Sequence, residues 1–149
     1  MKYLPKLAFI TAVFLILDQI SKYFAKIYLE NPIILIDNIF KFEYAENTGI
    51  AFSLPVPYVL ILISNIFIIG TLIYLAITEF DFSNNIAKIA TSLVIAGGMG
   101  NLIDRLIFGY VIDFISIWQY PFFNLADAYI ITAVLLLVVF YGKIKQVKK

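Results

Sequence analysis

The side chains in this sequence best suited to chemistry are aspartates that lie within or beside long apolar stretches. They are Asp18, Asp104, Asp113 and Asp127. A carboxylate at bilayer depth costs about 2.5–3.5 kcal/mol on insertion scales, so four of them require an explanation. The sequence contains no histidine and no cysteine. It therefore lacks the usual zinc and copper ligands and the usual Ser-His and Cys-His nucleophiles, and its chemistry must rest on carboxylates, amides, hydroxyls and a few Lys and Arg.

Asp113 and Asp127 differ from the other two aspartates because neither has a basic residue within four positions. An unpaired carboxylate in a membrane segment is a functional candidate by default. If the two approach each other, they share one proton and titrate in two coupled steps. The ionised member then takes a proton from water while the protonated member polarises an amide carbonyl, which is the aspartic-protease arrangement and needs no metal or cofactor.

The other polar residues of the apolar stretches have simpler interpretations. Asp18 and Lys22, at helical i,i+4 spacing, form either a self-contained ion pair or part of a site. Asp104 next to Arg105 is expected to be a scaffold contact, with Arg105 as the ligand-facing group. Asn65 is expected to form an interhelical hydrogen bond. The remaining acidic residues are interpreted as solvated surface groups: Glu30, Asp37, Glu43, Glu46, Glu79 and Asp81.

The composition indicates an integral membrane protein, with 62% hydrophobic residues, 14% charged residues and a mean hydropathy of +0.95. The net charge of +1 and the lack of a basic stripe argue against nucleic acid as a partner. Lysines precede the first apolar stretch and follow the last, so the positive-inside bias places both termini in the cytoplasm. Four predicted membrane spans satisfy this topology: Leu7–Tyr28, Tyr58–Thr78, Ile86–Ile107 and Phe122–Tyr141.

Two external segments connect these spans. In Leu29–Pro57, the alternation from Phe40 to Tyr44 predicts a strand, with another strand at Ile33–Ile36 and a turn between them. The second segment, Phe108–Pro121, is apolar and is expected to lie in the membrane interface. The predicted fold is therefore an all-α integral membrane domain over residues 1–149, with four transmembrane helices and a small external β-sheet platform between spans 1 and 2.

The predicted topology brings most of the membrane polar groups into one layer. Asp18 and Lys22 come late in an outward-going span, as do Asn101, Asp104 and Arg105, whereas Asn124 and Asp127 open an inward-going span. A single site just below the outer surface is the simplest interpretation. The glycines at positions 97, 98 and 100 allow either a helix or a substrate backbone to approach the third span closely, and ordinary helix packing explains them equally well.

Five motifs in order make the sequence resemble the bacterial lipoprotein signal peptidases (signal peptidase II). The motifs are Asp18-Gln19-x-x-Lys22, Glu46-Asn47-Thr48-Gly49-Ile50-Ala51-Phe52-Ser53, Gly97-Gly98-Met99-Gly100-Asn101-Leu102-Ile103-Asp104-Arg105, Val111-Ile112-Asp113-Phe114 and Phe122-Phe123-Asn124-Leu125-Ala126-Asp127. The resemblance covers nearly the whole chain. One departure is Ala96-Gly97-Gly98-Met99, where the family more often has Gly-Gly-Ala-x, a change among small residues.

The resemblance implies an aspartic endopeptidase that hydrolyses the peptide bond before a diacylglyceryl-modified cysteine of a prolipoprotein. Asp113 and Asp127 would be the catalytic pair. Residues that would shape the site or contact substrate are Asp18, Lys22, Asn47, Gly49, Asn101, Arg105 and Asn124. The family also implies a multi-pass protein of the bacterial cytoplasmic (inner) membrane that contacts membrane lipids and works without a cofactor or metal. We expect a monomer.

Two other classes of function remain open at this point. A small proton-coupled transporter would use the carboxylates as a relay, but the polar groups cluster near one surface and leave the inner half of the spans dry. A membrane scaffold without enzymatic activity would explain the spans but gives Asp113 and Asp127 no purpose.

Overall fold

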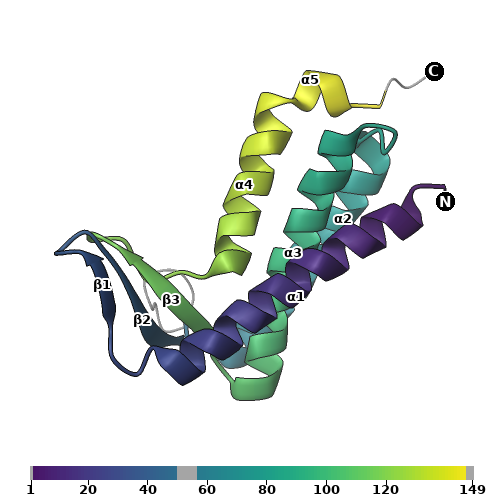
Figure 1. Cartoon of the computed structure of the whole chain (residues 1–149). Coiled ribbons are helices and arrows are strands. Elements are labelled where there is room, and N and C mark those ends of the chain that lie inside the picture. Colours follow the sequence, from purple (N-terminus) through teal and green to yellow (C-terminus); the bar gives the residue numbers. More distant parts are fainter. Residues whose placement is uncertain (1, 50–56, 147–149) are drawn as a thin grey trace.

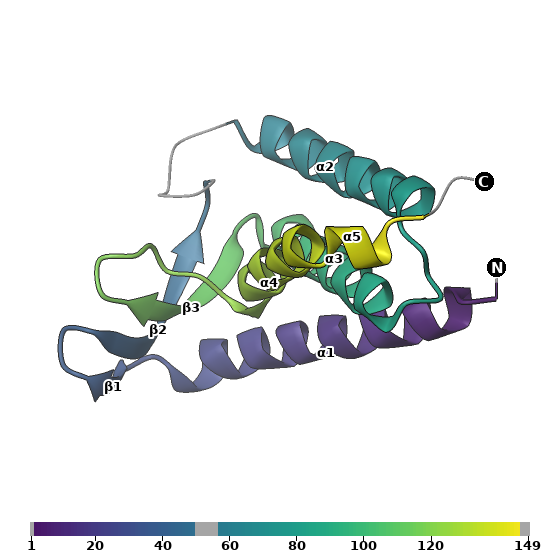
Figure 2. The same cartoon turned by 90° about the horizontal axis from the view of Figure 1, so that it is seen from above.

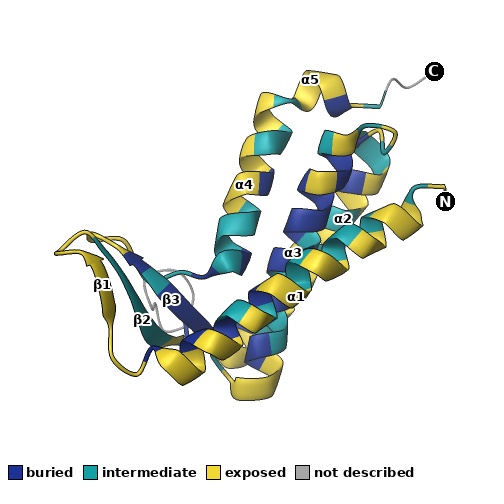
Figure 3. Cartoon of the chain, viewed as in Figure 1, coloured by how far each residue is buried: buried dark blue, intermediate teal, exposed yellow. Residues whose placement is uncertain are grey.

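The helices of the protein pack around one central helix, α3 (Asn85–Phe108), which contacts three others (Figure 1). The computed structural model describes residues 2–49 and 57–146. Ala87, Ala90 and Ala96 of α3 are fully buried, and these small side chains let the neighbouring helices approach closely. Figure 3 shows that the buried residues are concentrated on α3 and on the strand β3 (Val111–Ile117). The helices around α3 are α1 (Leu4–Tyr28), α2 (Tyr58–Glu79) and α4 (Leu125–Val139), which is followed by the short α5 (Tyr141–Ile144).

Among the described residues, three helices are long and apolar enough to cross a membrane: α1, α2 and α3. Their bounds lie close to those of the first three predicted spans. The fourth predicted span, Phe122–Tyr141, corresponds to α4, which has only 15 residues. Asn124 caps α4, so the helix begins at Leu125 instead of Phe122, and the chain leaves it again at Phe140. A fourth span is therefore not established by helix length and stays a prediction.

The outer faces of the helices are apolar and exposed, as expected for surfaces that meet lipid. Phe9 on α1 is 70% exposed and Phe67 on α2 is 72% exposed. Apolar surface of this extent is rare on soluble monomers and marks contact with a membrane or a partner. Figures 1 and 2 show the start of α1 and the short helix α5 at the end of the helices farthest from the strands.

A small antiparallel sheet extends from the other end of the helices, with strand order β1-β2-β3. Strands β1 (Ile33–Ile36) and β2 (Phe40–Asn47) confirm the predicted strand pair. Asn38 in the turn between them has φ 59°, a left-handed conformation that asparagine tolerates well. The third strand was not predicted. It lies within the segment Phe108–Pro121, where Val111–Ile117 pairs with β2, and the expectation that this segment lies in the membrane interface stays a prediction.

Strand β3 is buried on both faces, which explains why its sequence shows no alternation of apolar and polar residues. Ile112 and Phe114 pack with Ala25 and Leu29 at the end of α1. Val111 and Asp113, on the opposite face, line a large pocket. A strand that is covered on both faces has a nearly continuous apolar sequence. The sequence alone therefore does not distinguish such a strand from a segment that lies in the membrane interface.

Helix α4 lies against α3 at a point where only glycine fits. A Cβ atom at Gly97 would lie 2.5 Å from the backbone oxygen of Ala126, one residue before Asp127. A Cβ atom at Gly100 would clash with the carboxylate of Asp18. The glycines of α3 therefore serve helix packing in this structure, at the level of the predicted site.

We expect Gly97→Ala to destabilise the protein, because a backbone oxygen cannot move aside as a flexible side chain would. The expected loss is about 1–3 kcal/mol of unfolding free energy, typical of overpacking. Gly70→Ala on α2 is the matched control, since a Cβ atom there meets nothing within 4 Å. It should be neutral or stabilise the helix by up to about 1 kcal/mol. Thermal unfolding in detergent would compare the two variants, and equal midpoints would contradict this packing account.

Candidate active site

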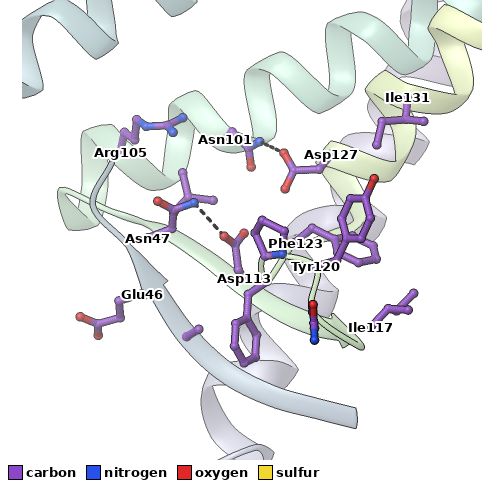
Figure 4. Close-up of a pocket in the computed structure, with 15 residues that line it drawn as sticks. Glu46, Asn47, Asn101, Arg105, Asp113, Ile117, Tyr120, Phe123, Asp127 and Ile131 are labelled. Carbon is purple, nitrogen blue, oxygen red and sulfur yellow. Dashed lines mark hydrogen bonds between the residues drawn. The ribbon is translucent and has the colours of Figure 1, made fainter. Parts of the chain in front are cut away.

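A cavity of about 810 Å³ lies between the sheet, α3 and the start of α4. Asp113 and Asp127 both line it, from β3 and α4 respectively. Figure 4 shows their carboxylates directed into the same space, with Asn47 and Asn101 beside them. The polar residues of the lining are Glu46, Asn47, Asn101, Arg105, Asp113, Gln119 and Asp127.

Asp113 is only 1% exposed and is held by two amide side chains. Asn124 Nδ2 donates to its Oδ1 at 2.7 Å, and Asn47 Nδ2 donates to its Oδ2 at 3.0 Å. Burial raises the pKa of Asp113 to about 7, and the nearby negative charge of Asp127 also raises it. The hydrogen bonds from Asn47 and Asn124 oppose this shift. Asp113 is therefore a carboxyl group that holds its proton near neutral pH.

Asp127 occupies the third position of α4 and forms a capping box with Asn124. The backbone N–H of Asp127 donates to Asn124 Oδ1 at 3.0 Å, and the backbone N–H of Asn124 donates to Asp127 Oδ2 at 3.3 Å. Asn101 Nδ2 donates to the other oxygen, Oδ1, at 2.8 Å. The carboxylate of Asp127 therefore lies at the N-terminus of α4 and accepts hydrogen bonds on both of its oxygens.

Asn124 connects the two aspartates. Its Oδ1 caps the helix that carries Asp127, and its Nδ2 lies within 2.7 Å of Asp113 Oδ1. The same nitrogen lies 3.1 Å from Asn101 Oδ1. The amides of Asn101 and Asn124 therefore set the relative positions of the two carboxylates, which come from different elements.

A second polar group lies behind the pocket, between α1 and α3. Lys22 Nζ is 2.9 Å from Asp18 Oδ2 and 2.9 Å from Asp104 Oδ2, and all three residues are at most 2% exposed. The predicted Asp18–Lys22 ion pair is thus present but includes Asp104 as a third member. Asp104 is a scaffold contact, as expected, and its partners are Lys22 and the backbone N–H of Ile112.

Arg105 and Asn47 both line the pocket, and Gly49 connects them. Its Nη2 donates to the backbone oxygen of Gly49 at 3.3 Å. The backbone N–H of Gly49 donates to Asn47 Oδ1 at 3.1 Å, so the amide of Asn47 is oriented with its nitrogen toward Asp113. The rest of the predicted asparagine motif, residues 50–53, lies outside the described residues.

Residues 10–142 of the chain match the family described as Signal peptidase (SPase) II. The chain belongs to the signal peptidase II family. This confirms the resemblance that its five motifs indicate.

Named relatives and a solved structure agree with the signal peptidase II match. The lipoprotein signal peptidase of Chlorobaculum parvum is 39% identical over 154 aligned residues, which cover 91% of this chain and 94% of the relative. That of Caldicellulosiruptor bescii is 40% identical over 124 residues, with 82% and 81% covered. A structure described as "Bacterial membrane enzyme structure by the in meso method at 2.3 A resolution" has a TM-score of 0.81 and 28% identity, covering 93% of this chain and 88% of that chain.

In this signal peptidase II family member, the pocket includes residues that the sequence analysis missed. Its apolar lining includes Ile117, Tyr120, Pro121, Phe122, Phe123 and Ile131. Phe122 and Phe123 are the first two residues of the fifth motif, so the motif itself was the available signal. Gln19 was also missed, although it lies inside the first motif. Its Nε2 is 3.2 Å from Asp18 Oδ2 and 3.1 Å from Asp104 Oδ1.

Among the described residues, the hydrogen bond expected between Asn65 and another helix is not formed through its Nδ2. Its Nδ2 is buried, yet no hydrogen-bond partner for it lies in the described part of the chain. Glu46, interpreted as a solvated surface residue, is exposed and also lies at the edge of the pocket.

Proposed function

We propose that this protein is an intramembrane aspartic endopeptidase that removes signal peptides from prolipoproteins. It would hydrolyse the peptide bond before a diacylglyceryl-modified cysteine. One observation carries the aspartic mechanism: Asp113 and Asp127 come from separate elements, face one pocket, and are held in different environments. Membership in the signal peptidase II family supports the reaction and the substrate.

The different environments assign a role to each aspartate. Asp113 is the acid, because burial raises its pKa to about 7 and so keeps it protonated near neutral pH. Asp127, with donors on both oxygens, is the base. As water attacks the carbonyl carbon, Asp127 takes a proton from the water and Asp113 gives its proton to the carbonyl oxygen. When the C–N bond breaks, Asp127 returns its proton to the leaving nitrogen and Asp113 recovers one from the intermediate's hydroxyl.

The length of α4 supports a site within the outer leaflet. Its 15 residues span about 22 Å, less than the roughly 30 Å of a hydrocarbon core. We propose that α4 is the fourth transmembrane helix and that it begins below the outer surface, at the level of the pocket. Both termini would then lie in the cytoplasm, and the sheet would rest on the outer surface of the cytoplasmic membrane.

The pocket suits a substrate that is part peptide and part lipid. Its polar residues gather around the two aspartates, whereas Phe122, Phe123 and Ile131 provide an apolar wall. A lipid-modified cysteine presents both kinds of surface next to the scissile bond. Since all described groups of the site come from one chain, we propose that a monomer is sufficient.

Processing of a prolipoprotein in cells depleted of their own signal peptidase II tests this function. Expression of this protein should convert the accumulated lipid-modified precursor to the mature form. The matched substrate is the same precursor with its cysteine replaced by serine, which cannot be lipid-modified and should remain uncleaved. If the lipid-modified precursor also stays unprocessed while this protein accumulates in the membrane, the proposed function is wrong.

Cleavage by the purified protein should fall as pH rises above about 7. The pKa of Asp113 is raised to about 7, so below this pH the residue has a proton to donate, and above it the carboxylate has none. Asn47→Ala should move the descending limb of kcat/KM to higher pH, because the hydrogen bond from Asn47 lowers the pKa of Asp113. Glu43→Gln, on the same strand as Asn47, is the control, and its pH profile of kcat/KM should match that of the wild type. A rate that keeps rising to pH 9 would contradict the assignment of Asp113 as the acid.

A further inference from the structure

Lys22 has a position that the proposed reaction does not yet explain. It is a buried lysine, 2% exposed, and it does not line the pocket. Its ammonium lies 2.9 Å from each of three acceptors: Asp18 Oδ2, Asp104 Oδ2 and Asn101 Oδ1. An ammonium has three N–H donors and no acceptor, so these three contacts account for all of its hydrogen-bonding capacity.

Each of the three acceptors of Lys22 is hydrogen-bonded either to Asp127 itself or to the residue that directly precedes Asp113 or Asp127. Asp18 Oδ1 accepts the backbone N–H of Ala126, the residue before Asp127, at 2.9 Å. Asp104 Oδ2 accepts the backbone N–H of Ile112, the residue before Asp113, at 3.1 Å. The third acceptor, Asn101, donates directly to Asp127. The contacts of Lys22 therefore reach both of the segments that carry the aspartates.

The contact with Asn101 also decides which end of its amide faces Asp127. Because Lys22 can only donate, it requires the oxygen of Asn101, and Asn124 Nδ2 donates to that same oxygen at 3.1 Å. The Nδ2 of Asn101 is then left to donate to Asp127 Oδ1 at 2.8 Å. A reversed amide would place an N–H group against the ammonium and an oxygen against the carboxylate.

We infer that Lys22 is a positioning residue that keeps the two aspartates different, by fixing Asn101 as a donor to Asp127 and by anchoring the backbone beside each aspartate. This inference rests on the proposed peptidase function. Lys22 does not touch substrate. It acts through Asn101, Asp18 and Asp104.

The charges around Asp127 come from several elements. Lys22 and Asp18 belong to α1, Asp104 and Arg105 to α3, Asp113 to β3, and Glu46 at the pocket edge to β2. Lys22 and Arg105 are the two cations in this described set, and only Lys22 bonds to a side chain that donates to Asp127. Removing the ammonium should therefore withdraw a positive charge from the surroundings of Asp127 and release the amide of Asn101 that donates to it.

The test compares Lys22→Met with Lys26→Met, measuring kcat and KM for cleavage of a lipid-modified prolipoprotein across pH. Lys26 lies one turn further along α1, is exposed, and stacks over the ring of Phe108. We expect Lys22→Met to lower kcat about 10-fold to 100-fold, with KM changed less than about threefold, and to move the ascending, acidic limb of the pH profile upward. Lys26→Met should have the same kcat, KM and pH profile as the wild type. A purely structural role would lower the amount of active enzyme and leave the pH profile unchanged, which would overturn the inference.

Lys22→Met leaves the buried carboxylates of Asp18 and Asp104 without their ion-pair partner, which destabilises the protein. A second variant is tested for the case in which Lys22→Met does not accumulate in the membrane. It combines Lys22→Met with Asp18→Asn and Asp104→Asn, whose side-chain oxygens still accept the backbone N–H groups of Ala126 and Ile112. This variant should accumulate and show the same loss of kcat, with KM changed less than about threefold, because it also lacks the donor that fixes the amide of Asn101. A wild-type kcat would overturn the role of Lys22. Asp113→Asn in the same assay separates this outcome from failure of the proposed function, because cleavage by Asp113→Asn would contradict the peptidase mechanism itself.

Discussion

Asp113→Asn and Asp127→Asn are each expected to abolish cleavage of a lipid-modified prolipoprotein, by about 10⁴-fold or more in kcat. Asparagine has nearly the same shape as aspartate but cannot carry the transferred proton. At position 127 it would remove the proposed base, and at position 113 it would remove the proposed acid. Cleavage by purified protein in micelles or vesicles measures the effect, with each variant compared at equal amounts of inserted protein.

Asp37→Asn provides the matched control for these two variants. Asp37 is an exposed aspartate in the turn between β1 and β2, outside the pocket lining. It should cleave at the wild-type rate and show that loss of an aspartate charge is not harmful in general. If either Asp113→Asn or Asp127→Asn retained more than about one-tenth of the wild-type rate, it could not be a catalytic acid or base of the proposed kind.

Replacement of Asn124 is expected to have the second-largest effect, because this residue both caps α4 and binds Asp113. Asn124→Ser keeps an N-cap oxygen for the backbone of Asp127 but loses the Nδ2 that bonds to Asp113 and Asn101. Asn124→Ala loses both functions. Both variants should lower kcat by about 10²–10³-fold, as expected when a fixed donor is removed from an active site.

The two Asn124 variants should differ in stability. Only Asn124→Ala loses the cap, so it alone should lose about 1 kcal/mol of unfolding free energy. Thermal unfolding and cleavage measured on the same samples separate the capping role from the catalytic one. Near-wild-type cleavage by Asn124→Ser would show that the amide of Asn124 does not organise the dyad.

Much of the candidate site could be predicted because helical spacing places residues on faces. Asn124 and Asp127 are three positions apart, and the structure joins them through a capping box. Asp18 and Lys22 are four positions apart, and they form the expected ion pair. The alternation of β2 was also sufficient to predict that strand, and the turn at Asp37-Asn38 indicated that the apolar run before it, β1, forms a hairpin with it.

The parts that were missed depend on contacts between distant segments. Asp104 binds Lys22 only because α1 and α3 pack side by side, and nothing near Asp104 in the sequence indicates this partner. Strand β3 has apolar residues on both faces, because one covers the end of α1 and the other lines the pocket, so its period was hidden. The start of α4 was misplaced because Phe122 and Phe123 are as apolar as a helix interior but belong to the pocket wall.

The mass of the products formed by the purified wild-type protein tests the central claim most directly. A lipid-modified prolipoprotein would be incubated with wild type and with Asp127→Asn, and the products identified by mass spectrometry. The account predicts two products from the wild type, the free signal peptide and a chain beginning with the lipid-modified cysteine, and neither from the variant. Cleavage at another bond, or the same products from Asp127→Asn, would contradict it.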